Sequence, residues 1–289
     1  MGDMAIQVVR TIADVRAHTA DARRHGRRIG FVPTMGALHD GHVRLIDEAR
    51  RDCDTVVVSI FVNPLQFDRR EDLDKYPRLL QADTERCRAL GVDVVFAPDV
   101  DEMYPQPPAC TVEVGSLATH LCGQFRPGHF AGVATVVLKL FEIVRPDRAY
   151  FGEKDAQQLV VVRRLVTDLN VPVDVIGVPT VREHDGLALS SRNLRLDAEE
   201  RRIAVSLFAA LKTAQDLIAT GRRDVSGIRH LATAMIPSDE RLRLEYLEIV
   251  DPDSMEPVET VTRPVLAAGA LWVGSTRLID NLLCTTPIL

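Results

Sequence analysis

Residues 28–42 read RIGFVPTMGALHDGH, and this stretch decides the fold. Its first part, Arg28–Pro33, is a short apolar run typical of a buried strand, and Gly41–Cys53 has the amphipathic pattern of a helix. Between the two lies a loop that contains glycine and histidine. A strand that passes through such a loop into a helix is the place at which open α/β sheets bind ligands. We therefore expect a ligand site at this loop.

The chain on both sides of this stretch alternates between strand-like and helix-like segments. Strands are predicted at Thr55–Val62, Val92–Phe96, Arg148–Phe151 and Val173–Val178, and helices at Thr11–His25, between Pro77 and Gly91, at Val133–Val144 and at Ala156–Leu169. Alternation at this spacing predicts an α/β fold, a doubly wound, Rossmann-like parallel sheet with helices on both faces.

The pattern changes after Pro179. One long helix is expected over Asp197–Thr220 and a second over Val225–Met235, followed by antiparallel strands at Leu242–Val250 and Leu266–Val273. We therefore expect two domains, a Rossmann-like domain over residues 1–180 and a smaller α+β domain over residues 181–289, each of ordinary size.

The charge of the chain argues against a protein that grips nucleic acid or an anionic membrane. The 289 residues carry 35 Lys and Arg against 41 Asp and Glu, a net charge of −6. Neither a signal core nor a run of the ~18 apolar residues that a membrane span needs is visible. The five scattered cysteines fit reduced thiols of a cytoplasmic protein. Of the four lysines, Lys154 follows a predicted strand, at the ligand-binding edge of the sheet.

The loop of the opening stretch has the chemistry of a phosphate site. His39 and His42 flank Gly41 at the start of a helix, where free N–H groups and the helix dipole favour an anion. Gly36 and Gly41 let a bulky ligand approach the backbone. This His-x-Gly-His pattern is identified as the signature of the nucleotidyltransferase superfamily.

Two further segments add groups that suit phosphates. Lys154, in Phe151–Asp155, can act as a movable point charge on a phosphate, and Asp155 can accept hydrogen bonds from ribose. Leu189–Asn193 offers two hydroxyls and a guanidinium, although on its own this pattern favours a helix-capping loop ahead of Asp197.

Together these segments resemble one family, the pantothenate synthetases (pantoate–β-alanine ligases). The resemblance runs, in order, through VPTMGALHDGH, SIFVNPLQF, YPR, RPGHFAGVATVVLKLF, FGEKD, QQL and SSRN. It implies an enzyme that condenses pantoate with β-alanine, using ATP and Mg²⁺, through a pantoyl adenylate and with release of AMP and pyrophosphate. It also implies a homodimer, and a C-terminal domain that closes over ATP bound, with pantoate, to the first domain.

The resemblance also implies the site residues. His42 is the residue usually assigned as proton donor, and His39 and Lys154 join it as catalytic groups. Pantoate is held by Gln66 and Gln158, with Gln66 also near β-alanine. The residues expected to bind ATP are Met35, Gly36, Ala37, Leu38, His39, Asp40, Gly41, His42, Gly152, Glu153, Lys154, Asp155, Val181, Leu189, Ser190, Ser191 and Arg192. Arg126 and His129 match a family segment near the site, with no role assigned.

The metal site departs from the pattern of some family members, in which a carboxylate pair and a glutamine after YPR are linked to Mg²⁺. Here Ala82, Asp83 and Arg86 follow that motif, so Asp83 alone keeps an oxygen ligand. We therefore expect Asp83 as the one candidate protein ligand, or Mg²⁺ carried by the ATP phosphates alone.

Three other functions remain open at this point. A nucleotidyltransferase of the same superfamily would stop after nucleotidyl transfer to a phosphate acceptor. The acceptor site would then carry extra basic residues, whereas this chain offers the neutral amides Gln66 and Gln158. An aminoacyl-tRNA synthetase would need a basic RNA-binding module. A non-enzymatic nucleotide-binding protein would bind ATP without turnover.

Overall fold

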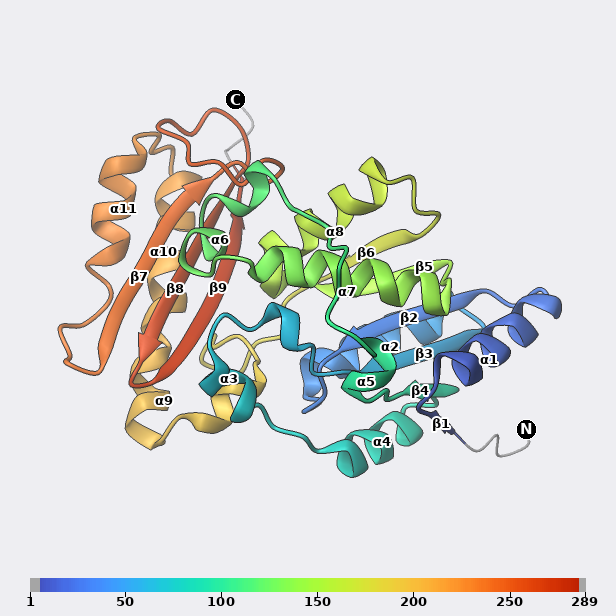
Figure 1. The fold of residues 1–289 in the computed structure, drawn as a ribbon. Helices are drawn as coiled ribbons and strands as arrows, with labels where there is room; N and C mark the ends of the chain where they lie inside the picture. The colour runs from blue at the N-terminus through green and yellow to red at the C-terminus, as the bar shows by residue number, and fades with distance from the viewer. Residues whose placement is uncertain (1–5, 286–289) are drawn as a thin grey trace. The chain divides into compact units, whose positions relative to one another are not determined.

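A six-stranded parallel sheet organises the N-terminal part of the computed structural model, which describes residues 6–285 (Figure 1). The strands run in the order β1 (Gln7–Val9), β4 (Val94–Phe96), β3 (Thr55–Ile60), β2 (Ile29–Thr34), β5 (Arg148–Gly152) and β6 (Asp174–Val178). The chain leaves β2 for β3 and β4 on one side, then crosses to β5 and β6 on the other. The order reverses between β2 and β5, which is where an open α/β sheet binds ligands. The predicted doubly wound, Rossmann-like fold is confirmed.

Helices cover both faces of this sheet because successive strand residues point in opposite directions. Phe31 of β2 meets Phe141 of α7 edge to face, with ring centroids 6.4 Å apart. Its neighbour Val32 packs instead with Leu45 and Ile46 of α2, in a buried apolar cluster on the other face. The helices of this part are α1 (Ile12–Arg24), α2 (Asp40–Asp52), α3 (Arg70–Asp74), α4 (Leu80–Ala89), α5 (Val100–Met103), α7 (His129–Val144) and α8 (Ala156–Asp168).

A three-stranded antiparallel sheet forms the C-terminal part, in the order β7 (Leu242–Val250), β8 (Val265–Val273) and β9 (Thr276–Cys284). Small residues in β8 let the helices approach closely: a Cβ atom at Gly269 would lie 2.7 Å from the side chain of Leu207 in α10. The helices are α9 (Ala198–Ala204), α10 (Ser206–Ala219) and α11 (Val225–Thr233). The predicted smaller α+β part is confirmed.

Some details of the sequence prediction were wrong or missing. The single helix expected over 197–220 is two helices, α9 and α10, because the hydroxyl of Ser206 donates to the carbonyl of Ile203 (2.7 Å) and the chain turns at Val205. Strands β1 and β9 were not predicted.

The chain divides into two units whose boundaries differ from the prediction. The first comprises residues up to Val114, Arg126–Glu153 and Gln158–Pro179, and the second comprises Gly115–Phe125, Lys154–Gln157 and everything from Thr180. The second unit's main segment begins where the second domain was placed. Its two short segments were unforeseen, because the contacts that bind them join residues distant in the chain.

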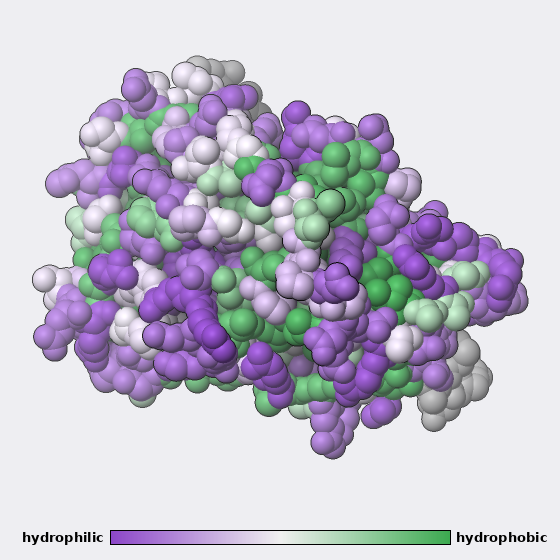
Figure 2. Space-filling model, viewed as in Figure 1, coloured by the Kyte–Doolittle hydropathy of each residue, from purple (hydrophilic) through white to green (hydrophobic). Residues whose placement is uncertain are grey.

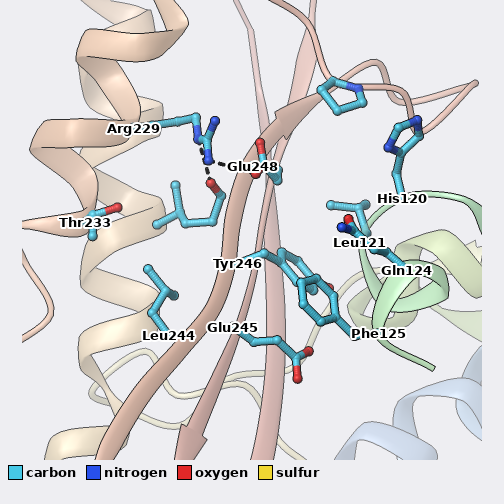
Figure 3. Close-up of a pocket in the computed structure, with 12 residues that line it drawn as sticks. His120, Leu121, Gln124, Phe125, Arg229, Thr233, Leu244, Glu245, Tyr246 and Glu248 are labelled. Atoms are coloured by element: carbon cyan, nitrogen blue, oxygen red, sulfur yellow. Dashed lines mark hydrogen bonds and ion pairs between the residues drawn. The ribbon is translucent and has the colours of Figure 1, made fainter.

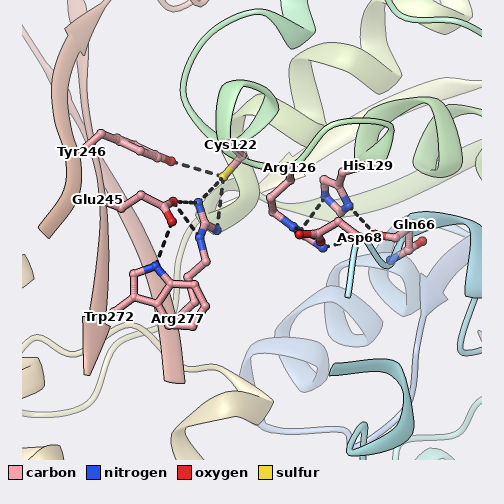
Figure 4. A network of polar contacts seen from close by, with 9 residues as sticks. All are labelled: Gln66, Asp68, Cys122, Arg126, His129, Glu245, Tyr246, Trp272 and Arg277. Atoms are coloured by element: carbon pink, nitrogen blue, oxygen red, sulfur yellow. Dashed lines mark hydrogen bonds and ion pairs between the residues drawn. The ribbon is translucent and has the colours of Figure 1, made fainter. Parts of the chain in front are cut away.

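Two sets of contacts hold the short segments to the second unit. Gln157 bonds the backbone of the segment 117–122 three times, donating to the carbonyls of Leu117 and His120 and accepting from the Cys122 amide. The thiol of Cys122 lies 3.2 Å from the hydroxyl of Tyr246 in β7, and Arg277 of β9 also reaches it (Figure 4). Helix α6 (Cys122–Phe125) thereby packs on the antiparallel sheet.

The face of the molecule in Figure 2 is largely hydrophilic, with apolar side chains scattered between charged ones. The large apolar residues that are exposed come from many elements, with Leu194 the most exposed at 77%. Among residues 6–285, the structure has no helix both long and apolar enough to cross a membrane.

Candidate active site

Three loops of the first unit meet at the carboxyl edge of the parallel sheet. Because β3, β2 and β5 are neighbours, the segments that follow them begin side by side. In chain order, these segments carry the predicted residues 35–42, Gln66 and Gly152–Glu153. The side-chain amide nitrogen of Gln66 lies 3.0 Å from the sulfur of Met35. The structure therefore brings the predicted ATP loop and the first predicted pantoate residue together.

The loop between β2 and α2 is held by a buried carboxylate. Asp83 of α4 is 3% exposed, and its two oxygens accept hydrogen bonds from the backbone N–H groups of Ala37 and Leu38, each 2.8 Å long. These bonds hold Ala37 in a left-handed conformation (φ 51°), which is costly for a residue with a side chain. Gly36 is also left-handed (φ 82°), and a Cβ atom there would lie 2.9 Å from Asp83.

The two histidines of the loop cap helix α2. The Nδ1 atom of His39 accepts from the amide of Gly41 (3.1 Å), and the Nδ1 atom of His42 accepts from the amide of His39 (3.2 Å). Because each Nδ1 accepts, each neutral ring carries its proton on Nε2. Gly41 is required here, since a Cβ atom would lie 2.8 Å from the His39 ring. The motif thus fixes the tautomer of both rings as Nε2–H donors.

A cation stands beside the same loop. Arg86, also on α4, donates to the carbonyl of Leu38 (2.9 Å) and forms an ion pair with Asp40 in the first turn of α2. The predicted ATP residue Asp40 is therefore engaged with an arginine.

Gln66 is oriented by an amide that the sequence prediction did not select. Asn63 is 1% exposed; its Nδ2 donates to the side-chain oxygen of Gln66 (3.2 Å) and to the carbonyl of Gly132 (3.1 Å). Its Oδ1 accepts from the hydroxyl of Tyr104 (3.0 Å) and the amide of Leu65 (3.3 Å). The side-chain oxygen of Gln66 accepts from Asn63 and one N–H is directed at the sulfur of Met35, so its second N–H is the donor that remains for a ligand. Burial raises the pKa of Tyr104 to about 12, so the phenol stays a donor.

The remaining predicted phosphate residues belong mainly to the second unit. Lys154 and Asp155 lie in a short helix, η3 (Glu153–Asp155), that follows β5, and they form an ion pair of 3.2 Å. The Lys154 side chain is 15% exposed. Its backbone carbonyl accepts from the side chain of Asn281 in β9 (2.8 Å). Lys154 is therefore anchored by its backbone while its ammonium group is paired with the neighbouring carboxylate.

The predicted residues from Val181 to Arg192 lie on a hairpin and the turn that follows it. The Leu189 amide donates to the Val181 carbonyl (3.0 Å), so these two residues face each other. Ser190 caps the short helix η4 (Ser191–Arg195) by accepting from the amide of Arg192 (3.3 Å). The helix-capping interpretation of this segment is thus correct as structure, and it places both serines and the arginine on one turn.

The hairpin is fixed to the antiparallel sheet by an ion pair that the sequence prediction missed. Arg182 binds both oxygens of Asp280 in β9, at 2.7 and 3.0 Å. Burial raises the pKa of Asp280, and the Arg182 pairing opposes that rise. The sequence carries no local signal for the pair, because 98 positions separate its members.

The predicted Gln158 and its neighbour behave differently. Gln157 is 6% exposed, and both the oxygen and the nitrogen of its side-chain amide are hydrogen-bonded to the backbone of the segment 117–122. Gln158 lies next to it in the first turn of α8 and is only partly buried. Within residues 6–285, none of the hydrogen bonds described for Gln66 involves Gln158.

The described residues show no cluster that would form a metal centre. Within residues 6–285, no group of three or more His, Cys, Asp or Glu side chains is placed to hold an ion. Asp83 holds the loop between β2 and α2 with both of its oxygens. Arg86 brings positive charge to the position at which some family members have an amide.

A hollow lies in the C-terminal unit, between β7, α11 and α6 (Figure 3). Its volume is about 290 Å³, and an ion pair between Arg229 and Glu248 (2.8 Å) crosses its wall. Phe125 and Tyr246 stack on its other side, with centroids 5.7 Å apart. None of the predicted site residues lines it.

Comparisons with known proteins agree with the geometry. The family model for pantoate-beta-alanine ligase matches residues 7–283. The chain is 52% identical to a pantothenate synthetase of Moorella thermoacetica over 276 residues, which cover 96% of this chain and 98% of the relative.

Two solved structures are similar over almost their whole length. The pantothenate synthetase of Thermus thermophilus is 47% identical, with a TM-score of 0.91 over 96% of this chain and 99% of that one. The pantoate-beta-alanine ligase of Francisella tularensis, solved in complex with beta-gamma ATP and beta-alanine, is 34% identical, with a TM-score of 0.81 over 96% and 98%.

Proposed function

The chain belongs to the pantoate-beta-alanine ligase family, and we propose that it condenses pantoate with β-alanine to pantothenate, with conversion of ATP to AMP and pyrophosphate. The observation that carries this proposal is the match over residues 7–283, which includes the capped histidine loop between β2 and α2. A nucleotidyltransferase that stops after nucleotidyl transfer is not favoured, because the relatives are ligases.

In the first step, a carboxylate oxygen of pantoate attacks the α-phosphorus of ATP and pyrophosphate leaves, which gives pantoyl adenylate. Negative charge builds on the phosphoryl oxygens and on the departing pyrophosphate, so catalysis requires donors and cations placed in advance. We assign this role to the Nε2–H groups of His39 and His42, with the N-terminus of α2 behind them. Lys154 and Arg192 are proposed to supply positive charge for the triphosphate, and Ser190 and Ser191 to donate hydrogen bonds to it.

The remaining ATP contacts follow the predicted set. Val181 and Leu189, paired on the hairpin, are proposed to lie against adenine, and Asp155 to bind ribose hydroxyls. Loop residues 35–42 and Gly152–Glu153 complete the nucleotide site. We further propose that the second unit closes over bound ATP, which would protect the hydrolysable mixed anhydride from water.

In the second step, the neutral amine of β-alanine attacks the acyl carbon of the adenylate and AMP leaves. The amine loses a proton as the amide bond forms. The hydrogen bond from Asn63 to its side-chain oxygen orients the amide of Gln66, and we propose that Gln66 holds pantoate through its second N–H, together with Gln158, and lies near β-alanine.

Mg²⁺ is proposed to arrive with the ATP phosphates, since the described residues form no ligand cluster. No step above depends on a metal held by the protein. A homodimer and a cytoplasmic location are also proposed, the former from the family resemblance and the latter from the free cysteines.

The test is an assay of purified protein with ATP and Mg²⁺, in which pantoate and β-alanine are supplied singly and together. Pantoate alone should support exchange of labelled pyrophosphate into ATP, and both substrates should yield pantothenate and AMP in equal amounts. Pantoate labelled with ¹⁸O in its carboxylate should transfer one label to AMP. Pyrophosphate exchange that is indifferent to pantoate would overturn the assignment. His42→Ala and Lys154→Ala should each reduce turnover by roughly 10²-fold or more while the protein remains folded.

A further inference from the structure

A chain of polar contacts ends on the backbone of Gln66. In Figure 4, Arg126 and His129 point toward Gln66 and Asp68. Gln66 is the last residue of the short helix η1 (Pro64–Gln66), and Asp68 follows that helix. The Nδ1 atom of His129 lies 2.7 Å from the carbonyl oxygen of Gln66, and a terminal nitrogen of Arg126 lies 3.2 Å from the same oxygen. None of these groups has a role in the reaction steps above except Gln66.

The contacts fix the state of the His129 ring. A carbonyl oxygen can only accept, so Nδ1 of His129 must donate. The other ring nitrogen, Nε2, lies 3.1 Å from a guanidinium nitrogen of Arg126, which can only donate. His129 is therefore held as the neutral Nδ1–H tautomer, the opposite of His39 and His42.

Arg126 is in turn held by a carboxylate. Its Nε donates to Asp68 at 2.8 Å, and the two side chains are only 14% and 22% exposed. Burial opposes ionisation of Asp68, but its hydrogen bond and ion pair with Arg126 outweigh burial and lower its pKa. A partly buried, charge-assisted pair of this kind restricts the guanidinium more than a surface pair does.

The start of α7 also presses on the same turn. A Cβ atom at Gly132 would lie 2.2 Å from the carbonyl oxygen of Leu65 and 2.8 Å from Cα of Gln66. The glycine permits this contact, and one helical turn earlier His129 supplies the hydrogen bond. The backbone of Gln66 is thus fixed from two positions on α7.

From this geometry we propose that Asp68, Arg126 and His129 are positioning residues for pantoate. They act through the carbonyl of Gln66 and keep its side-chain NH₂ group in place for the substrate. This inference rests on the proposed function, because it needs Gln66 to bind pantoate. It predicts an effect on the KM for pantoate and none on the KM for ATP.

The test uses two substitutions of one residue. His129→Asn keeps a donor near the place of Nδ1, whereas His129→Phe keeps the ring and removes the donor. We expect His129→Phe to raise the KM for pantoate roughly tenfold, the equivalent of about 1.4 kcal/mol, and His129→Asn to stay within about threefold of the wild type. His25→Asn, at the exposed end of α1, serves as the matched control.

A second variant covers the case in which His129→Phe does not fold. Asp68→Asn keeps the shape of the side chain and one acceptor oxygen but removes its charge, so Arg126 loses its ion pair. We expect the KM for pantoate to rise roughly threefold while the protein remains folded. Asp168→Asn, which breaks the exposed ion pair with Arg164 on α8, is the control.

The outcomes separate the two proposals. A wild-type protein that makes no pantothenate refutes the proposed function itself. If the wild type is active, the positioning role is wrong under any of three results: a KM for pantoate unchanged in Asp68→Asn and in folded His129→Phe, equal rises in the KM values for pantoate and ATP, or His129→Asn as defective as His129→Phe.

Discussion

Asp83→Asn tests whether a buried carboxylate shapes the ATP loop or binds a metal. The carboxylate accepts from the amides of Ala37 and Leu38, both at 2.8 Å. An asparagine keeps one acceptor oxygen, but its NH₂ group then faces the second backbone N–H of the loop, and two donors cannot form a hydrogen bond. Loss of one hydrogen bond to a buried charge should lower the free energy of unfolding by about 2–3 kcal/mol. The left-handed conformation of Ala37 is itself unfavourable by about 1–2 kcal/mol, so Ala37 should leave it once this bond is lost. Because the ATP loop then changes shape, the KM for ATP should rise about tenfold.

Urea denaturation and steady-state kinetics measure these effects, each at several concentrations of Mg²⁺. Glu85→Gln, on the exposed face of the same helix, is the control and should change neither quantity. An unfolding free energy and a KM for ATP equal to those of the wild type would refute the reasoning. Recovery of the variant by excess Mg²⁺ would refute it too, because that result is expected of a lost metal ligand.

Three further predictions concern close contacts and burial. Gly41→Ala should displace the His39 ring, whose Cε1 would lie 2.8 Å from the new Cβ, and should slow adenylate formation in a single turnover about 10²-fold; Gly115→Ala, with open space around it, should not. Gly132→Ala should destabilise the protein by about 1–3 kcal/mol in urea and raise the KM for pantoate, since its Cβ would meet the backbone of η1 at 2.2 Å. Burial raises the pKa of Cys87 from its ordinary 9.0 to about 12, so the stabilisation by its neutral thiol is complete below about pH 9 and is lost as the pH rises toward 12. Cys87→Ala should therefore weaken the alkaline fall in stability, and a fall equally steep in the variant would contradict this.

Local sequence was enough wherever neighbouring residues carry the signal. Thr11 caps α1 by accepting from the amide of Asp14 (3.1 Å), and α7 ends at Val144, with Arg145 as its C-cap directly before Pro146. Such contacts join residues within one turn, so their patterns are visible in the chain. The two-residue turn that leads from β8 into β9, by contrast, was overlooked, although Gly274 marks it with φ 54°.

The site residues that the family resemblance implies stay predictions, and the structure gives the contacts that some of them make. The structure brings Met35 to Gln66 and pairs Val181 with Leu189. Asn63 is recognisable in the sequence as a polar amide at the end of an apolar strand, but it was not selected as a site residue. The ligands that the predicted residues bind stay predictions.

The sequence by itself determined the alternating α/β order, the histidine loop and the family, because periodicity, capping and motifs are encoded within short stretches. Only the tertiary structure decided what Asp83 and His129 hold. Asp83 is 46 positions from Ala37, and His129 is 63 positions from Gln66. A hydrogen bond requires atoms to meet within about 3 Å, and which distant residues do so depends on how helices pack against the sheet rather than on local sequence.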